Sequence, residues 1–386
     1  MHYKIGFKKL GSKNWVGGHN YLRNLTSIIN TRLKNKIKLI YIKIENESLK
    51  DIDIKKFDTI VIIKKNNNLL RRILNFFYDF SLNKIINSEL DFYFELSYAG
   101  LFSNNNNIIS WIPDFQHKRL PQMFSFYEYW HREIKFKIKI FFRKNIIVSS
   151  KDAKKDCVKF YNKNPKQIHV LRFSIFTDPL NHVNKFNYLQ KKYEIKKNYI
   201  YIPNQFWMHK NQDIVLKALE YIKSKDLIIY NQIPQIIFSG KAFDFRSKDH
   251  AKKILKKIRS SNFHNKVKYL GLIPLHDVYK LNANCLCLIN PSFFEGWSTT
   301  VEEAKSFGTP QILSNIPIHK EQSPNSIFFN PHSYMNLAEI LTNIAIKKII
   351  LKRKKIKTIL RDQEKKNIDY ANNFIKIIDK LHKIKL

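Results

Sequence analysis

Short runs of β-branched and aromatic residues alternate with helical patterns along most of this 386-residue chain, and this alternation constrains its fold most strongly. Strands that alternate with helices indicate parallel sheets with both faces covered. The runs form two consecutive sets, which predicts two α/β domains. The expected strands are residues 3–7, 38–44, 59–63, 92–96, 108–111, 146–149 and 169–173 in the first set, and 199–203, 235–239, 267–270, 285–289, 311–314 and 326–329 in the second.

The join between the two sets is expected in the polar stretch at 178–197, which separates two strands. We therefore predict one domain over residues 1–180 and another over residues 190–360. Ligands of such open parallel sheets bind at the carboxyl ends of the strands, so the loops that follow the strands are the places to search for a site.

The formal net charge of +38, from 69 Lys and Arg against 31 Asp and Glu, would suit a nucleic-acid or anionic-lipid partner. However, lysines occur in every segment, and Ile and Asn are also abundant, as AT-rich coding would produce. We interpret most of the charge as compositional. A functional basic face is the alternative.

The three cysteines, Cys157, Cys285 and Cys287, are odd in number and lack a metal-binding spacing, which favours a reducing cytoplasm over a disulfide scaffold. The latter two alternate in an apolar strand and are expected to pack. The first residues lack the apolar core of a signal peptide, and no run approaches the ~18 apolar residues of a membrane span.

Three acidic residues and two glycines gather in one strand–loop–helix segment, although the chain has only 9 glycines. The loop follows the strand expected at 285–289, and the helix begins near Thr299. Thr299 with Glu302, and Thr300 with Glu303, match the spacing of a capping box. Gly308, before a Thr-Pro pair, is expected to end this helix.

The start of this helix is a predicted anion site. The backbone N–H groups of Gly296, Trp297, Ser298 and Thr299 are expected to lack partners within the helix, and such groups suit a phosphate or a sugar hydroxyl. Glu295 lies in the loop before them. A solvated Glu295, and a Glu303 that only favours the helix dipole, are the alternatives.

The segment "FEGWSTTVEEAKSFGTP" (294–310) resembles the E-x7-E segment of the retaining glycosyltransferases of GT-B fold, family 4, also called glycosyl transferases group 1. The resemblance implies an α/β fold of GT-B type, with two Rossmann-like parallel-sheet domains facing a central cleft. It implies that Glu303 holds the ribose of a nucleotide-sugar and that Glu295 lies at the donor sugar. Ser298, Thr299 and Thr300 stand where the family often has Gly, Leu and Pro.

Three further segments resemble the family in the same order along the chain. "YIPNQFWMHKNQDIVLKAL" resembles the strand–loop whose basic pair neutralises the donor diphosphate. Lys210 fits the Lys of that pair, whereas Asn204 or Gln205 stands at the Arg position. Diphosphate binding is therefore expected to depend on Lys210 and on the helix N-terminus.

The first domain carries the other two segments. Gly17 and Gly18 precede an expected helix and resemble the loop whose backbone approaches the donor phosphate. "IISWIPDFQHKRLPQMFS" resembles the strand and His-Asp pair beside the transferred sugar. Pro113 stands in the His place and Asp114 in the Asp place, so His117 is expected to supply the imidazole. A tight Gly-Gly turn and a surface His are the alternatives.

The resemblance predicts a retaining hexosyltransferase that moves a hexose or deoxyhexose from a nucleotide-diphosphate sugar to a cell-surface glycan of the lipopolysaccharide, O-antigen or capsule type. Asp114, His117 and Glu295 are the predicted catalytic residues. No metal or other cofactor is expected, because preorganised cations and amides can stabilise the leaving diphosphate. The first domain would bind the acceptor and the second the donor. Residues 361–386 would form a helix that packs back on the first domain.

The expected partners are the donor and a glycan or lipid-linked acceptor, with no nucleic acid. The protein is expected in the bacterial cytoplasm, or peripherally on the inner face of the plasma membrane. Residues 131–145 mix basic and apolar side chains, which suits either an anionic membrane surface or a helix packed on the sheet. A nucleotide-sugar epimerase of the same fold and a basic nucleic-acid-binding protein are the competing functions.

Overall fold

The computed structural model describes residues 2–8, 16–47, 54–64, 74–75, 77–96, 100, 103, 106–183, 186–244, 246–260, 263 and 265–385. The chain divides into two compact units. The first comprises Met1–Lys118, Phe126–Phe176 and Lys365–Leu386, and the second comprises Arg119–Ser125 and Thr177–Glu364. Acceptor binding by the first domain and donor binding by the second remain predictions.

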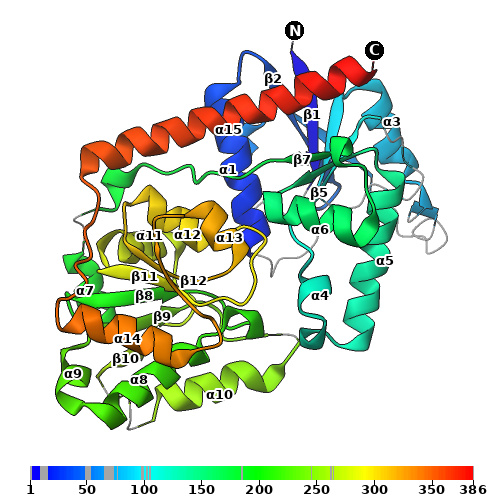
Figure 1. The fold of residues 1–386 in the computed structure, drawn as a ribbon. Coiled ribbons are helices and arrows are strands. Elements are labelled where there is room, and N and C mark those ends of the chain that lie inside the picture. Colours follow the sequence, from blue (N-terminus) through cyan, green and yellow to red (C-terminus); the bar gives the residue numbers. More distant parts are fainter. Residues whose placement is uncertain are drawn as a thin grey trace. The chain divides into compact units, whose positions relative to one another are not determined.

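Parallel strands in the order β3-β2-β1-β4-β5-β6-β7 form the sheet of the first unit (Figure 1). These strands are β1 (Tyr3–Lys8), β2 (Ile37–Ile44), β3 (Thr59–Ile63), β4 (Phe92–Glu95), β5 (Ile108–Ile112), β6 (Asn145–Val148) and β7 (Ile168–Val170). Its helices are α1 (Val16–Arg32), α3 (Phe80–Ser88), α4 (Gln116–Arg119), α5 (Phe126–Phe142) and α6 (Lys151–Tyr161).

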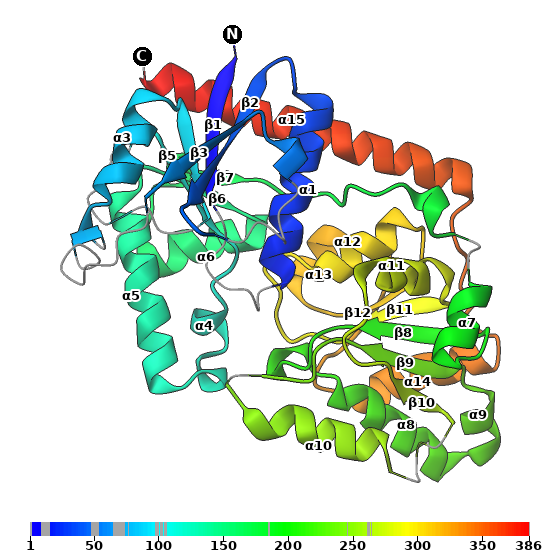
Figure 2. The ribbon, with the colours of Figure 1, turned by 180° about the vertical axis from the view of Figure 1, so that it is seen from behind.

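The second unit has a parallel sheet in the order β10-β9-β8-β11-β12-β13. Its strands are β8 (Tyr199–Pro203), β9 (Gln235–Ser239), β10 (Val267–Tyr269), β11 (Cys287–Asn290), β12 (Gln311–Ser314) and β13 (Ile327–Phe329). Its helices are α7 (Asn187–Tyr193), α8 (Asp213–Lys225), α9 (Leu227–Gln232), α10 (Lys248–Ile258), α11 (Leu275–Asn284), α12 (Thr299–Ser306), α13 (Pro317–Gln322) and α14 (Tyr334–Ala345). Figure 2 shows α11, α12 and α13 on one face of this sheet and α8, α10 and α14 on the other.

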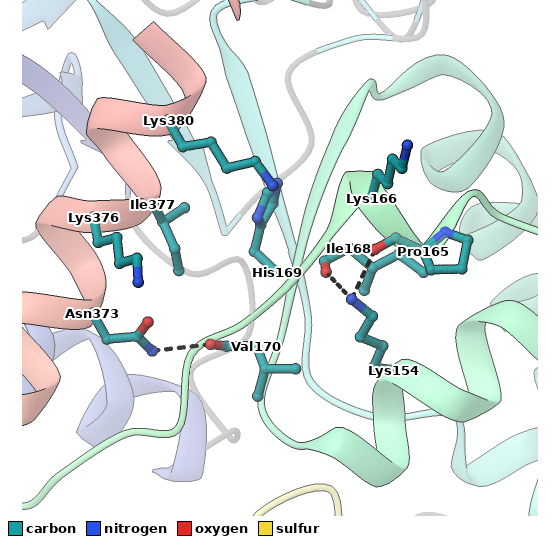
Figure 3. A pocket seen from close by; sticks show the side chains of 10 residues that line it. All are labelled: Lys154, Pro165, Lys166, Ile168, His169, Val170, Asn373, Lys376, Ile377 and Lys380. Atoms are coloured by element: carbon teal, nitrogen blue, oxygen red, sulfur yellow. Dashed lines mark hydrogen bonds between the residues drawn. The ribbon is translucent and has the colours of Figure 1, made fainter. Parts of the chain in front are cut away.

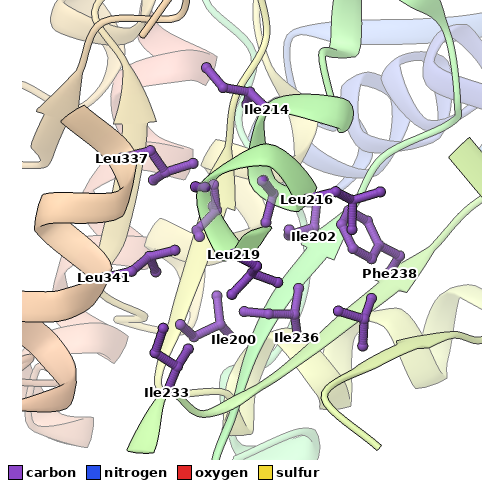
Figure 4. Packing of buried hydrophobic residues seen from close by; sticks show 14 of the residues in the cluster. Ile200, Ile202, Ile214, Leu216, Leu219, Ile233, Ile236, Phe238, Leu337 and Leu341 are labelled. Carbon is purple, nitrogen blue, oxygen red and sulfur yellow. The ribbon is translucent and has the colours of Figure 1, made fainter. Parts of the chain in front are cut away.

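The core of the second unit follows from the alternation of side chains along its strands. Ile200 and Ile202 of β8 point into a buried cluster with Leu216 and Leu219 of α8 and Leu337 of α14 (Figure 4). The neighbouring tyrosines of β8 point to the opposite face, where they pack with residues of α7 and α11. Both faces are therefore apolar, as a central parallel strand requires.

The last helix, α15 (Ile356–Lys385), begins in the second unit and continues into the first. In the first unit, Tyr3 Oη donates to Asp379 Oδ1 over 2.8 Å and Ser174 Oγ donates to Asn367 Oδ1 over 2.9 Å. The C-terminal segment thus contributes packing and hydrogen bonds to the unit that contains the N-terminal strand.

Two local expectations were wrong. Gly17 and Gly18 do not precede the first helix but lie in its first turn, because α1 already begins at Val16. Cys285 does not alternate with Cys287 in a strand, since Cys285 caps the end of α11 and β11 begins two residues later. Cys285 and Cys287 are nevertheless both buried, as expected for packing residues.

Gly308 gives a direct test of the turn that ends α12. Its φ is +64°, and a Cβ there would lie 2.6 Å from Cδ1 of the buried Ile359. Gly271 has φ +76° but no atom within 4 Å of such a Cβ. We expect Gly308→Ala to lower the free energy of unfolding by about 2–4 kcal/mol, because strain and overpacking add, and Gly271→Ala by about 1 kcal/mol. Urea unfolding of both variants measures this difference, and equal losses would contradict the packing argument.

Candidate functional site

The loops after β8 and β11 follow neighbouring strands at the point where the strand order of the second sheet reverses. These two strands are neighbours, yet the following strands lie on opposite sides, β9 beside β8 and β12 beside β11. Such a reversal opens a crevice at the carboxyl edge of a parallel sheet, which is where ligands of these sheets bind. The predicted residues Asn204, Gln205, Lys210, Glu295 and Gly296 all belong to these two loops.

Asn290, the last residue of β11, organises the loop that follows it. Its fully buried side chain donates from Nδ2 to Ser298 Oγ (2.7 Å) and to Thr300 Oγ1 (3.1 Å). Its Oδ1 accepts a hydrogen bond from Ser292 Oγ over 2.6 Å. One amide side chain therefore connects the beginning of the loop with the beginning of α12.

The N-terminus of α12 lacks the predicted capping box. The N-cap residue is Ser298, one residue before the expected position, and its hydroxyl makes no capping hydrogen bond because it faces Asn290 and Thr300. Since the N-cap residue makes no capping hydrogen bond with its own side chain, the amides of the first turn remain suited to an anionic ligand. The amide of Ser298 is an exception, because it donates to Gln322 Oε1 over 3.2 Å.

Lys210 and Glu295, predicted separately from two different loops, form an ion pair. Lys210 Nζ lies 2.7 Å from Glu295 Oε1, and both side chains are largely shielded from solvent. Ser292 Oγ also donates to Glu295 Oε1, over 2.7 Å. Burial, the largest single effect, would raise the pKa of Glu295. The charge of Lys210, an electrostatic contribution from His319 and the hydrogen bonds from Lys210 and Ser292 together hold this pKa below its ordinary value. Glu295 is therefore ionised and fixes the ammonium group of Lys210 at the sheet edge.

His319 in α13 is part of the same buried region and was missed by sequence reasoning. It is fully buried, and its Nδ1 lies 2.9 Å from the carbonyl oxygen of Ser314. Burial lowers its pKa to about 4, although the charge of Glu295 acts in the opposite direction. The ring is therefore neutral near pH 7. Its position just after β12, at the carboxyl edge of the sheet, was the signal that could have identified it.

A second cation lies beside the loop after β8, although the Arg position of the expected pair holds Asn204 or Gln205. Arg246, which follows β9, pairs with Asp244 over 3.0 Å, and its Nη2 lies 3.2 Å from His209 Nδ1. Asn204 is buried, whereas Gln205 is half-buried. Sequence reasoning missed Arg246 because it belongs to another loop of the same sheet edge.

Glu303 lies in the middle of α12 and is only 3% exposed. It is near Tyr201 of β8, because its negative charge, after burial, contributes to raising the pKa of that phenol. Glu302 points elsewhere, toward Lys305 Nζ at 2.8 Å and Gln322 Nε2 at 3.3 Å. The two adjacent carboxylates therefore have different surroundings, and only Glu303 approaches the strand that leads to Lys210.

In the first unit, Gly17 and Gly18 follow β1, which lies beside β4 where the order of that sheet also reverses. The amides of a first helical turn have no partners within the helix. The backbone at Gly17 and Gly18 therefore keeps the chemistry that the sequence suggested, in a helix rather than in a loop.

Asp114 and His117 lie after β5 and make hydrogen bonds to different partners. Asp114 accepts a hydrogen bond from Arg132 Nη2 over 2.5 Å. His117 is fully buried, with Nε2 3.0 Å from Glu133 Oε2 and 3.1 Å from Tyr161 Oη. The alternative of a surface His is wrong, because His117 is fully buried, whereas its role beside the transferred sugar remains a prediction.

No group of three or more His, Cys, Asp and Glu side chains that could hold a metal ion occurs among the described residues. Metal independence remains a prediction. Likewise, no described helix has both the length and the apolar character needed to cross a membrane.

Comparison with known proteins places this geometry in context. Residues 186–367 match the model of the family described as glycosyl transferases group 1. The O-antigen chain mannosyltransferase RfbU of Salmonella typhimurium is 26% identical over 202 residues, which cover 52% of this chain and 51% of RfbU. The match thus spans about half the length of this relative.

Solved structures match almost the whole chain. Anabaena HepE in complex with UDP has a TM-score of 0.70 at 14% identity, covering 98% of this chain and 100% of HepE. The lipopolysaccharide outer core galactosyltransferase WaaB has a TM-score of 0.62 at 16% identity, covering 99% and 100%. The predicted fold class, α/β with two Rossmann-like parallel-sheet domains of GT-B type, is confirmed. The comparisons support a glycosyltransferase of this fold.

The contribution of the Lys210–Glu295 pair to stability can be measured by substitution. Glu295→Gln leaves the ammonium group of Lys210 without its charged partner in a largely buried place, so we expect a loss of about 3–5 kcal/mol in the free energy of unfolding. Asp213→Asn is the control, because Asp213 pairs with Lys217 and Lys257, whose side chains are 51% and 40% exposed. That variant should lose at most about 1 kcal/mol. Urea unfolding at pH 7 compares them, and a similar loss in both variants would contradict a special role for the buried pair.

Proposed function

We propose that this chain is a retaining glycosyltransferase of family 4 that moves a hexose or deoxyhexose from a nucleotide-diphosphate sugar to a growing cell-surface glycan. The observation that carries the proposal is the ammonium group of Lys210, which Glu295 holds at the point where the strand order of the second sheet reverses. Glu295 belongs to the loop that leads directly into α12, whose N-cap residue makes no capping hydrogen bond with its side chain. A diphosphate is the kind of ligand that a fixed cation and the amides at a helix N-terminus recognise together.

The relatives favour the same class of donor and acceptor. HepE binds UDP in its crystal structure, RfbU acts in the O-antigen chain, and WaaB acts on the lipopolysaccharide outer core. We therefore propose a nucleotide-sugar donor and an acceptor of the lipopolysaccharide or O-antigen type for this chain.

The donor would lie along the carboxyl edge of the second sheet. Lys210 and the amides of Gly296, Trp297 and Thr299 would contact the diphosphate and the sugar. Glu303 would accept hydrogen bonds from the ribose hydroxyls, since a buried carboxylate near β8 is a strong acceptor for such groups. Asn204 and Gln205, in the loop after β8, would add neutral contacts in place of a second cation in that loop.

Transfer with retention would proceed on the face from which the diphosphate departs. The acceptor hydroxyl attacks the anomeric carbon while the bond to the diphosphate breaks, and a phosphate oxygen of the leaving group takes the acceptor proton. Lys210 stabilises the negative charge that develops on the diphosphate, which is the main electrostatic requirement of this step. Glu295 would act next to the donor sugar and keep Lys210 in position. Asp114 is proposed to lie beside the transferred sugar.

No metal or other cofactor is required by this proposal, because Lys210 and the helix amides supply the positive electrostatic environment. The competing epimerase function would also bind a nucleotide-sugar, but it would not transfer the sugar to an acceptor. The nucleic-acid alternative has less support, since the residues at the proposed site include the carboxylates Glu295 and Glu303 and no recognised nucleic-acid motif.

An assay of nucleoside diphosphate release with and without glycan acceptor tests the function. We expect release to depend on the acceptor and NMR of the product to show the anomeric configuration of the donor. Glu303→Gln should raise the dissociation constant of the productive nucleotide-sugar at least about tenfold, because charged hydrogen bonds to the ribose are lost. Glu302→Gln is the matched control on the adjacent residue and should change it less than about threefold.

Acceptor-independent conversion of the nucleotide-sugar into its epimer would favour the epimerase, and an inverted product would exclude retention. Equal effects of the Glu303 and Glu302 substitutions on nucleotide-sugar affinity would remove the ribose role of Glu303.

Helix α5 supports the predicted contact with a membrane surface, where lipid-linked acceptors would be met. Its buried side contains Glu133 and Ile140, so one of its faces packs on the unit. A neighbouring side of the helix exposes large apolar side chains at helical spacing: Phe126, Tyr127, Trp130, Ile134 and Phe141. Basic residues accompany them, among them Lys137, whose side chain is 61% exposed. Apolar side chains with nearby cations suit the interface of an anionic bilayer, so we propose a peripheral location on the inner face of the plasma membrane.

Binding to anionic lipid vesicles tests this surface. Trp130→Ser combined with Phe141→Ser should lower the partition coefficient at least about tenfold, because two large apolar side chains no longer enter the interface. Leu272→Ser combined with Ile228→Ser removes exposed apolar side chains of the second unit and should have little effect. Cosedimentation measures both. Equal loss in the two double variants, or no binding by the unmodified protein, would contradict the proposed membrane face.

A further inference from the structure

A basic pocket of about 560 Å³ lies in the first unit, away from the residues assigned to the donor (Figure 3). It is formed where α6, β7 and α15 come together. Four lysines and one histidine belong to its lining, together with apolar side chains of β7 and α15. The residues used in the argument below are Lys154, Lys166, His169, Asn373, Lys376 and Lys380.

The pocket is built on the open edge of the sheet. β7 is the last strand in the sheet order, so one of its edges has no neighbouring strand among the described residues. Lys154 Nζ donates to the carbonyl oxygen of Ile168 over 2.8 Å, and Asn373 Nδ2 donates to that of Val170 over 3.1 Å. Lys154 also donates to the carbonyl oxygen of Pro165, over 2.7 Å. The side chains of α6 and α15 thus satisfy the strand edge and hold the pocket walls in place.

The positive charge of this pocket is not balanced by the protein. Lys376 and Lys380 are one turn apart on α15, and in Figure 3 Lys380 extends toward His169, while Lys154 rises from α6 on the other side. Within the described part of the chain, no carboxylate lies within ion-pair distance of Lys154, Lys166, Lys376 or Lys380. Ammonium groups gathered around one cavity repel one another, and an anion within the cavity relieves that repulsion.

His169 adds a hydrogen-bonding group at the base of the pocket. Its side chain lines the cavity although the residue is only 8% exposed. Its Nε2 is buried and has no hydrogen-bond partner among the described residues. Burial, followed by the charges of Lys380 and Lys154, lowers the pKa of His169 to about 4. A buried polar atom without a partner costs free energy, so this atom is suited to a bound ligand.

We propose that this pocket is a binding site for a phosphate group, separate from the donor site. Lys376, Lys380 and Lys154 would surround the phosphate oxygens, and the neutral ring of His169 would donate from Nε2 to one of them. Three nearby ammonium groups suit a dianionic phosphomonoester better than a single carboxylate. The phosphomonoester has three oxygens that share two negative charges, so each ammonium group can contact a different oxygen. Lys166 lies at the rim and would contribute at longer range.

The apolar part of the lining, Ile168, Val170 and Ile377, and the size of the cavity leave room for the group that carries the phosphate. Two sources supply this chemistry, a small soluble phosphate compound or the headgroup of a phosphorylated lipid. The experiment separates them by presenting the phosphate in both forms.

The test compares two double variants of the full chain that remove the same charge from the same helix. Lys376→Gln with Lys380→Gln removes two lysines of the pocket. Lys365→Gln with Lys383→Gln removes two exposed lysines of α15 outside it. Both variants keep Lys210, so phosphate bound at the proposed donor site contributes equally to each. His169→Leu tests the hydrogen bond, and circular dichroism confirms that each protein is folded.

Isothermal titration calorimetry with inorganic phosphate and pyrophosphate forms the soluble arm. Cosedimentation with vesicles containing phosphatidic acid, against vesicles of equal charge containing phosphatidylglycerol, forms the lipid arm. We expect saturable binding in at least one arm, weakened at least about tenfold in the Lys376/Lys380 variant and less than about twofold in the Lys365/Lys383 variant. A soluble source predicts the effect in calorimetry, and a lipid source predicts it with phosphatidic acid only.

The absence of binding in both arms would overturn the proposal. Equal weakening in the two lysine variants would also overturn it, since the helix would then attract anions only through its overall charge. Binding that is unchanged by His169→Leu, with the lysine effect intact, would exclude the hydrogen bond from Nε2 and leave a purely cationic site, contrary to the proposal.

Discussion

The arrangement of the candidate site depends on the ion pair between Lys210 and Glu295, which joins the loop after β8 to the loop after β11. Two hydrogen bonds also connect these loops, from Phe293 N to the carbonyl oxygen of His209 and from Asn211 Nδ2 to that of Pro291. Each loop leaves a neighbouring strand of the same sheet, and the pair fixes one against the other at 2.7 Å. Taking both charges out of water costs free energy that their attraction only partly returns, so such a pair is weak evidence for stability. Its value is positional, because it holds one ammonium group at the sheet edge.

The surrounding polar groups explain why the pair persists in a buried place. Asn290 and Ser292 bring donors to the carboxylate side, with Ser292 Oγ 2.7 Å from Glu295 Oε1. Asn290 also donates a hydrogen bond to the hydroxyl of Ser298, and that hydroxyl therefore does not cap the first turn of α12. Two hydrogen-bonding roles therefore compete for Ser298. Its hydroxyl bonds Asn290 and stabilises the loop, and for this reason it does not cap α12.

The sequence predicted the strands of both sheets and the parallel α/β class, because buried strands need continuous apolar runs that are visible without a structure. It also identified Lys210 and Glu295, but not that they contact each other, since their contact depends on sheet order. The capping box failed because spacing alone cannot show that the N-cap of α12 is Ser298, one residue earlier than expected. The alternative of a surface His117 is wrong because α5 and α6 cover the ring with Glu133 and Tyr161, which the sequence around His117 does not show.

The distribution of charge shows a similar limit of composition. A formal net charge of +38 gives no location for any site. In the structure some lysines are compensated individually, as Lys210 is by Glu295, whereas those of the basic pocket in the first unit share a cavity without a carboxylate within ion-pair distance among the described residues. The position of a cation relative to partners, rather than the total charge, thus distinguishes a specific anion site from a solvated face.

A crystal structure of the chain with a non-hydrolysable nucleotide-diphosphate sugar tests the central claim most directly. We expect the diphosphate within hydrogen-bond distance of Lys210 Nζ and of the first-turn amides of α12, with the ribose at Glu303. Well-defined density for the nucleotide away from the loops after β8 and β11, with Lys210 making no contact to it, would contradict the account.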